Sequence, residues 1–193
     1  MDNEMIESNL TSKRRDMEFV KFSKIPRISR ECVITEKIDG TNASIYIGED
    51  EEFLTGSRTR WITPEDDNYG FSRWANENKE ELLKLGVGFH YGEWWGQGIQ
   101  RKYNMDRKVF SLFNVGIWGD NEIRPKCCSV VPVLFEGMFD THNINDTLAH
   151  LVKTGSMASK GFMNPEGVVI FHRPSYYLFK KTILKDEEYK GRR

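Results

Sequence analysis

Short apolar runs separated by glycine, proline and polar clusters dominate the chain, and this pattern predicts strands over most of its length. The segment Val33 to Ile47 has β-branched residues on both sides of an Asp39-Gly40 pair, which is typical of two strands joined by a tight turn. Four further apolar runs are predicted to form strands: Val109 to Trp118, Val130 to Phe139, Val168 to Phe171 and Tyr176 to Leu184.

Two segments have the spacing of helices instead. Between Gly70 and Gly86 the apolar residues fall on one helical face, and the second glycine would end the helix. A second helix is predicted to begin at Asn143 or Asn145 as its N-cap, to run through Val152 and to end at Gly155. Because helices and strands are interspersed without a regular strand-helix-strand repeat, we expect an α+β fold with largely antiparallel sheets.

The length of 193 residues suits one domain. Residues 1–20 are polar and without periodicity, so we expect a flexible N-terminal arm followed by a single domain over residues 21–190. The 28 Lys and Arg against 29 Asp and Glu give a net charge of −1, so any nucleic-acid binding must use a local basic surface. No segment approaches the roughly 18 apolar residues of a membrane-spanning helix, and the start does not resemble a signal peptide, so we expect a cytoplasmic protein with no membrane partner.

The most informative segment is Thr35 to Asn42, which contains Lys37 and Asp39 two positions apart. In an extended strand these two side chains would project from the same face, which places an amine beside a carboxylate. An amine must be neutral to act as a nucleophile, whereas an ordinary lysine, with a pKa of about 10.4, is protonated at neutral pH. Taken alone, this spacing favours a solvated lysine beside a hairpin turn, because short motifs of this kind are common.

Five further motifs follow this segment in order along the chain. They are Ser57-Arg58-Thr59-Arg60, Tyr91-Gly92-Glu93-Trp94, Phe110-Ser111-Leu112-Phe113-Asn114, Pro165-Glu166-Gly167-Val168-Val169-Ile170 and Leu178-Phe179-Lys180-Lys181-Thr182. The set resembles the covalent nucleotidyltransferase superfamily of ligases and capping enzymes over residues 20–190. Within that superfamily, the run Glu36 to Asn42 resembles the RNA ligase 2 type of ATP-dependent RNA ligase, which is common in bacteriophages. The resemblance implies an ATP-grasp-like ligase adenylation domain, with two mostly antiparallel sheets flanked by helices.

The resemblance also implies a role for each motif. Lys37 would attack the α-phosphorus of ATP, release pyrophosphate and hold AMP through a phosphoramidate bond. Phe113 would stack on the adenine, and Phe110, inside the same apolar run, is expected to belong to the core. The implied nucleotide-binding residues are Glu36, Lys37, Asn42, Arg58, Glu93, Phe113, Glu166, Lys180 and Lys181.

Asp39 and Glu166 are the candidate ligands of a divalent metal. Glu166 begins an apolar strand, where a carboxylate is costly unless a cation or a hydrogen-bond donor faces it. Mg²⁺ or Mn²⁺ would supply that cation, because such ions bind one or two carboxylates together with phosphate oxygens and waters.

The two adjacent lysines of the last motif are both catalytic candidates. The wider superfamily usually has lysines two residues apart at this place. Strand alternation puts Lys180 and Thr182 on one face and Lys181 on the other, so only one lysine can face the phosphates, and we favour Lys180.

Arg101 and Lys102 are candidate contacts for an RNA end or for the ATP tail, although an ordinary loop would explain them equally well. The implied reaction joins 5′-phosphate and 3′-hydroxyl ends of RNA, and DNA or hybrid ends stay open as substrates. Because the chain ends soon after Lys181, we expect no C-terminal accessory domain, so an accessory protein or a dimer would have to replace it. Two alternatives remain: a capping-type guanylyltransferase that uses GTP, and a non-catalytic module that binds RNA ends.

Overall fold

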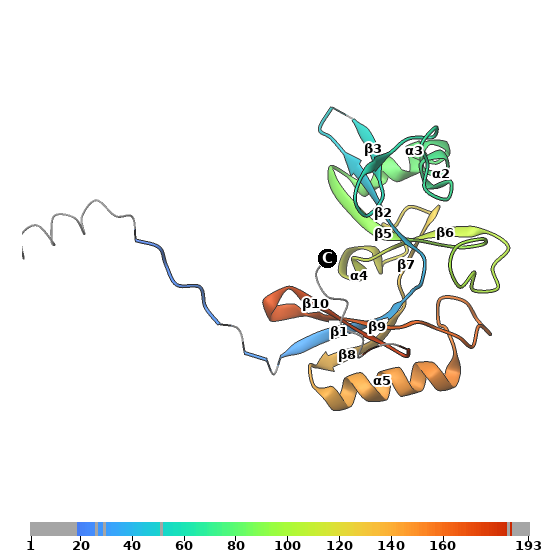
Figure 1. The fold of residues 1–193 in the computed structure, drawn as a ribbon. Helices are drawn as coiled ribbons and strands as arrows, with labels where there is room; N and C mark the ends of the chain where they lie inside the picture. The colour runs from blue at the N-terminus through green and yellow to red at the C-terminus, as the bar shows by residue number, and fades with distance from the viewer. Residues whose placement is uncertain (1–18, 26, 29, 51, 185, 187–193) are drawn as a thin grey trace, which may run out of the picture.

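The computed structural model describes residues 19–25, 27–28, 30–50, 52–184 and 186, and these form two β-sheets with helices packed against them (Figure 1). The predicted α+β fold with mostly antiparallel sheets is therefore confirmed. Residues 1–18 of the expected N-terminal arm lie outside the described residues, and its last two residues, like residues 21–25 of the expected domain, have no regular secondary structure.

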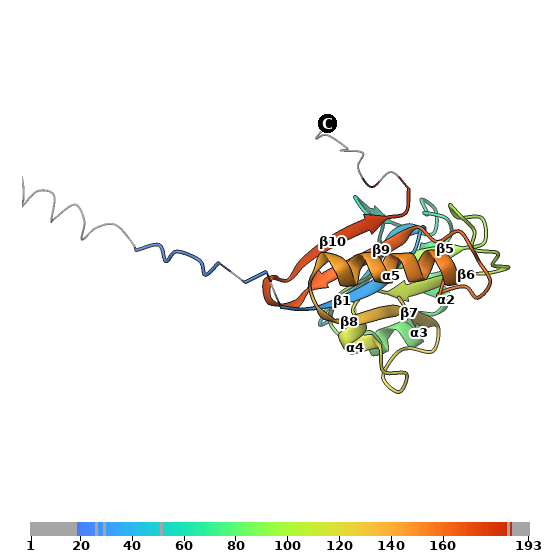
Figure 2. The ribbon, with the colours of Figure 1, turned by 90° about the horizontal axis from the view of Figure 1, so that it is seen from below.

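The first sheet has four antiparallel strands in the order β10-β9-β1-β8. These are β1 (Glu31–Lys37), β8 (Val133–Met138), β9 (Gly167–His172) and β10 (Tyr177–Thr182), with the short helix η2 (Arg173–Ser175) between the last two. Helix α5 (Thr141–Thr154) lies along one face of this sheet (Figure 2). Leu151 of the helix packs there against Ile34 and Ile170. Lys37 lies on the opposite face of the sheet, away from α5.

The second sheet has six strands in the order β4-β3-β2-β5-β6-β7, antiparallel except for the β6–β7 pair. The strands are β2 (Thr41–Ile47), β3 (Phe53–Gly56), β4 (Trp61–Ile62), β5 (Gly88–Gly96), β6 (Lys108–Leu112) and β7 (Cys128–Val130). The helical segments are α2 (Phe71–Glu77), α3 (Lys79–Leu82), η1 (Leu83–Leu85) and α4 (Val115–Trp118). Phe71 of α2 packs against Trp94 and Phe110 of the sheet, so α2 covers the face that these two side chains share.

The predicted hairpin around Asp39 and Gly40 is wrong. Both strands exist, but β1 belongs to the four-stranded sheet and β2 to the six-stranded sheet. Residues 38–40 cross from one sheet to the other, and Ile38 is buried with Trp95 in a small apolar cluster. A side chain on Gly40 would place its Cβ 2.5 Å from the carbonyl oxygen of Trp94, so the glycine permits this close approach.

The predicted helices are found with altered details. The first is interrupted at Asn78, which separates α2 from α3, and ends at Gly86 after η1. The second has Asp140 as its N-cap, not Asn143 or Asn145, because the Asp140 carboxylate accepts a hydrogen bond from the backbone of Asn143.

The strand predictions hold less well in the middle of the chain than at its end. The run Val109 to Trp118 divides into β6 and α4, and Val130 to Phe139 divides into β7 and β8. The last two predicted strands are confirmed as β9 and β10. Within the described part of the chain, no helix is long and apolar enough to cross a membrane.

Candidate nucleotide-binding site

Lys37 lies at the end of β1 and forms an ion pair with Glu166, which directly precedes β9. The register of the two strands brings them together, because Lys37 is opposite Gly167. The Lys37 Nζ is 2.5 Å from the Glu166 Oε2, and both side chains are largely buried. The cation that a carboxylate at this position requires is therefore supplied by Lys37 itself.

Glu93 reaches the same region from the six-stranded sheet. Its carboxylate accepts a hydrogen bond from the backbone N–H of Gly40 at 3.0 Å and one from the Asn42 amide at 3.3 Å. Burial raises the pKa of Glu93 to about 7, against the lowering influence of the Gly40 N–H and of Lys37. The neighbouring negative charges of Glu166 and Asp39 raise it further.

Asp39 does not share a strand face with Lys37, because β1 ends before it. Its carboxylate instead accepts a hydrogen bond from the Arg101 Nε at 2.9 Å, and its backbone N–H donates to the Tyr103 hydroxyl at 2.8 Å. The Tyr103 ring is fully buried, and burial raises the pKa of its hydroxyl. The structure thus places Arg101 against the segment that follows Lys37. Lys102, the other cation expected to contact RNA, is exposed.

The register of β9 and β10 separates the two adjacent lysines as strand alternation predicts. Lys180 is opposite Val169, which is opposite Thr35, two residues before Lys37, so Lys180 is on the sheet face of Lys37. Lys181 is on the other face, and its Nζ is 3.2 Å from the Asp186 carboxylate. The register therefore confirms that the two lysines are on opposite faces, and the preference for Lys180 as the phosphate contact stays a prediction.

Glu36 is placed differently from what the resemblance implies. It points to the face of β1 opposite to Lys37, and its side chain is fully buried. Its Oε2 accepts hydrogen bonds from the backbone N–H groups of Met157 and Ala158 at 2.8 and 2.9 Å. Its Oε1 is buried without a hydrogen-bond partner among the described residues, and burial raises the pKa of the carboxyl group. In this structure Glu36 holds the loop after α5 rather than joining the cluster around Lys37.

The remaining candidates lie on the six-stranded sheet. Arg58 is exposed in the turn between β3 and β4, and its side chain makes no hydrogen bond or ion pair with Lys37, Glu93 or Glu166. Phe113 is 41% exposed, whereas Phe110 is completely buried in the core, as expected. Phe113 borders a cavity of about 370 Å³ that Tyr91 also lines, and Tyr91 is two residues before Glu93 on the same face of β5. This volume is in the range of small-molecule sites.

The carboxylates suit a metal that is shared with a nucleotide, not a metal held by protein alone. Among the described residues, no three His, Cys, Asp or Glu side chains lie close enough together to hold an ion. The negative charges of Glu166 and Asp39 raise the pKa of Glu93, so a cation bound to any one of these carboxylates would lessen the repulsion among them. Mg²⁺ and ions of similar preference bind one or two carboxylates and take their other ligands from phosphates and water.

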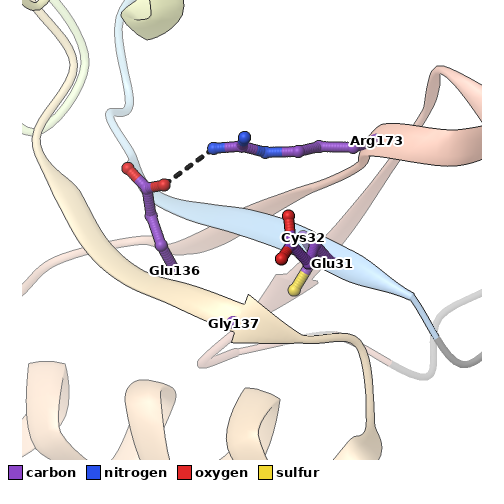
Figure 3. Close-up of a pocket in the computed structure, with 5 residues that line it drawn as sticks. All are labelled: Glu31, Cys32, Glu136, Gly137 and Arg173. Atoms are coloured by element: carbon purple, nitrogen blue, oxygen red, sulfur yellow. Dashed lines mark hydrogen bonds and ion pairs between the residues drawn. The ribbon is translucent and has the colours of Figure 1, made fainter.

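A second pocket lies at the other end of β1 (Figure 3) and contains none of the predicted site residues. Its lining residues are Glu31, Cys32, Glu136, Gly137 and Arg173. The Arg173 guanidinium spans it and donates to the Glu136 carboxylate at 2.7 Å. With a volume of about 150 Å³, it is smaller than typical ligand sites.

Tyr103 and Asn164 also contribute to the site, and sequence reasoning assigned no role to Asn164. Tyr103 supports Asp39 from the core, and Asn164 binds the Arg101 guanidinium through its side-chain and backbone oxygens. The only signal for Asn164 in the sequence is its position two residues before Glu166.

Comparisons with solved structures find the same fold in RNA ligases. An RNA ligase from Naegleria gruberi, solved as an arginine-to-alanine variant with ATP and Mn, matches with a TM-score of 0.61 and 21% identity over 80% of this chain. A glutamate-to-alanine variant of that ligase, solved with AMP and Mn, matches with a TM-score of 0.61 and 18% identity over 79% of this chain. The matches cover 50% and 49% of the Naegleria chains, so this chain spans about half their length. A comparison with curated proteins found no match.

The match to a protein-family model extends over most of the chain. The model of the RNA ligase family matches residues 30–185, which include Lys37, Glu93, Glu166 and both lysines of β10. The chain therefore belongs to the RNA ligase family.

Proposed function

We propose that this chain is the nucleotidyltransferase domain of an ATP-dependent RNA ligase. The observation that carries the proposal is the convergence of Lys37, Glu166 and Glu93, which come from two sheets and three distant parts of an RNA ligase family domain. A lysine beside carboxylates, in a domain that also has a cavity lined by the exposed Phe113 ring, suits attack on a bound nucleotide.

In the first step, the Lys37 Nζ attacks the α-phosphorus of ATP. The new bond joins nitrogen to phosphorus, the bond from the α-phosphorus to the pyrophosphate oxygen breaks, and the amine loses a proton. An ammonium held by Glu166 at 2.5 Å has no free electron pair, so the ion pair must open and the proton must leave before the attack. Lys180, on the same face, would offset the charge that develops on the phosphate oxygens.

The base and sugar of the nucleotide would lie against the six-stranded sheet. Phe113 would stack on the base, and Glu93, fixed by Gly40 and Asn42, would accept hydrogen bonds from the ribose. Glu166 and Asp39 would hold a divalent ion, which would neutralise phosphate charge when bound. The Naegleria ligase was solved with ATP, AMP and Mn, which supports ATP and Mg²⁺ or Mn²⁺ for this chain.

In the later steps, AMP passes to the 5′-phosphate of an RNA end, and a 3′-hydroxyl displaces it. The match covers half of the Naegleria chain, and the described residues show no contact that assigns a surface to the sealing step. Lysine adenylylation is the step that the geometry supports most directly.

The test is covalent labelling of the purified chain. The protein is first treated with pyrophosphate to remove bound AMP and then incubated with Mg²⁺ and ATP labelled at the α-phosphate. We expect a pyrophosphate-sensitive label that is absent from Lys37→Ala and Lys37→Arg. Stronger labelling from GTP would indicate a capping-type enzyme instead. A folded parent that takes no label from either nucleotide, but binds RNA ends as well as Lys37→Ala does, would indicate a non-catalytic module.

A further inference from the structure

Arg101 connects the two chain segments that carry the Lys37–Glu166 pair. Its Nε donates to the Asp39 carboxylate at 2.9 Å, and its Nη1 donates to the side-chain and backbone oxygens of Asn164 at 2.9 and 3.1 Å. Asp39 is two residues after Lys37, and Asn164 is two residues before Glu166. One guanidinium group therefore sets the separation of the segment after β1 from the segment before β9.

The hydrogen bonds of Arg101 to Asp39 and Asn164 also connect the two sheets. Arg101 belongs to the loop between β5 and β6 of the six-stranded sheet, whereas Lys37 and Glu166 belong to the four-stranded sheet. Tyr103, from the same loop, accepts a hydrogen bond from the backbone N–H of Asp39. The loop therefore binds both the backbone and the side chain of Asp39.

The loop adopts an unfavourable backbone to present these side chains. Gln100, Lys102, Tyr103 and Asn104 all have φ between 42° and 59°, a region that residues other than glycine rarely occupy. Such conformations persist only when surrounding contacts enforce them, and they cluster at functional sites. The bonds of Arg101 and Tyr103 to Asp39 are contacts of this kind.

We propose that Arg101 is a positioning residue for the transfer of AMP to Lys37, an inference that rests on the proposed function. It acts through Asp39 and Asn164, holding Lys37 and Glu166 at the geometry that in-line attack requires. Lysine cannot replace it, because a single ammonium lacks the planar fork that reaches both partners at once. This role differs from contact with an RNA end, since the Nε and Nη1 donors already bind protein oxygens.

The test measures the single-turnover rate of lysine adenylylation as a function of ATP concentration, without RNA. The variants are Arg101→Ala, Arg101→Lys, Asn164→Ala and the double variant Arg101→Ala with Asn164→Ala. Arg107→Ala is the matched control, because Arg107 is an exposed arginine of the same loop. Circular dichroism and urea unfolding check that each variant is folded, and Arg101→Lys preserves the charge if Arg101→Ala does not fold.

We expect Arg101→Ala to lower the saturated rate about a hundred-fold, with a much smaller change in the ATP concentration at half-saturation, because misplacement by about 1 Å has this effect. Arg107→Ala should react at the parental rate. Arg101→Lys should remain impaired, millimolar guanidinium should restore part of the rate to Arg101→Ala, and the double variant should be little slower than Arg101→Ala.

Two results would overturn the inference, and they differ from failure of the proposed function. If the parent is labelled and folded Arg101→Ala and Arg101→Lys react as fast as the parent, Arg101 has no positioning role. If both variants are adenylylated at the parental rate but bind or seal RNA ends more slowly in a second assay that contains RNA, Arg101 contacts RNA instead. A parent that takes no label refutes the proposed function, and the inference falls with it.

Discussion

Glu93 should make the chain less stable as the pH rises towards neutrality. Its side chain is buried, and burial raises its pKa from an ordinary 4.5 to about 7. Between these two values the folded state keeps a proton that the unfolded state has lost. Raising the pH across this window therefore favours the unfolded state. The decrease in the free energy of unfolding is complete once the pH exceeds the folded-state pKa.

The expected magnitude follows from the size of the shift. At roughly 1.4 kcal/mol per pKa unit, a shift from 4.5 to about 7 corresponds to a loss of about 3 kcal/mol in the free energy of unfolding. Glu93→Gln removes the ionisation while retaining an oxygen for the Gly40 N–H, so the variant should lack this contribution. The glutamine amide cannot also accept the Asn42 hydrogen bond. Its loss lowers the stability that the variant gains over the parent at high pH by about 1 kcal/mol.

The assay is urea unfolding of the parent and of Glu93→Gln at several values between about pH 4.5 and pH 8. Other groups, including the buried Glu36, titrate in both proteins, so the difference between the two curves isolates Glu93. Glu122→Gln is the control, because Glu122 is exposed. We expect Glu93→Gln to be more stable than the parent at the upper end of the range. Parallel curves for parent and variant would refute the assignment of a raised pKa to Glu93.

Three further predictions concern the residues around the site. Gly40→Ala should lower the free energy of unfolding by about 1 to 3 kcal/mol and abolish labelling, since its Cβ would meet the Trp94 carbonyl; urea unfolding and labelling together check this. Lys180→Ala should slow adenylylation more than Lys181→Ala, because Lys180 shares the face of Lys37, and an equal loss in rapid-quench kinetics would contradict the face assignment. Glu36→Gln should be labelled at close to the parental rate, because its side chain is on the opposite face; a large loss would show that Glu36 contacts the nucleotide.

Strand alternation could be used from the sequence alone because it depends only on neighbouring residues. It separated Lys180 from Lys181, and the register of β9 and β10 confirms the two faces. The expectation that Phe110 would be buried also holds, since the apolar run around it is local information. Glu166 was recognised as a carboxylate that needs a cation, and Lys37 provides it.

The path of the chain between the sheets could not be predicted in this way. An Asp-Gly pair between two β-branched runs has the same local pattern whether it turns within one sheet or crosses to another. The decisive fact is the close approach of Gly40 to the Trp94 backbone, and this depends on a strand about fifty residues away. The contact between Arg101 and Asn164 could not be predicted for the same reason, since these residues are 63 positions apart in the sequence.

The crossing explains why the site is at the junction of the sheets. If residues 38–40 formed a hairpin turn, Lys37 and Asn42 would lie on neighbouring strands of one sheet, and Glu93 would belong to that sheet too. Instead, β1 brings Lys37 to Glu166, while β2 and β5 bring Asn42 to Glu93, so a nucleotide held by the proposed site would contact both sheets. Its reactive geometry then depends on how the sheets are held together, which explains why the contacts of the crossing segment with Arg101 and Tyr103 matter as much as the groups that would touch the nucleotide.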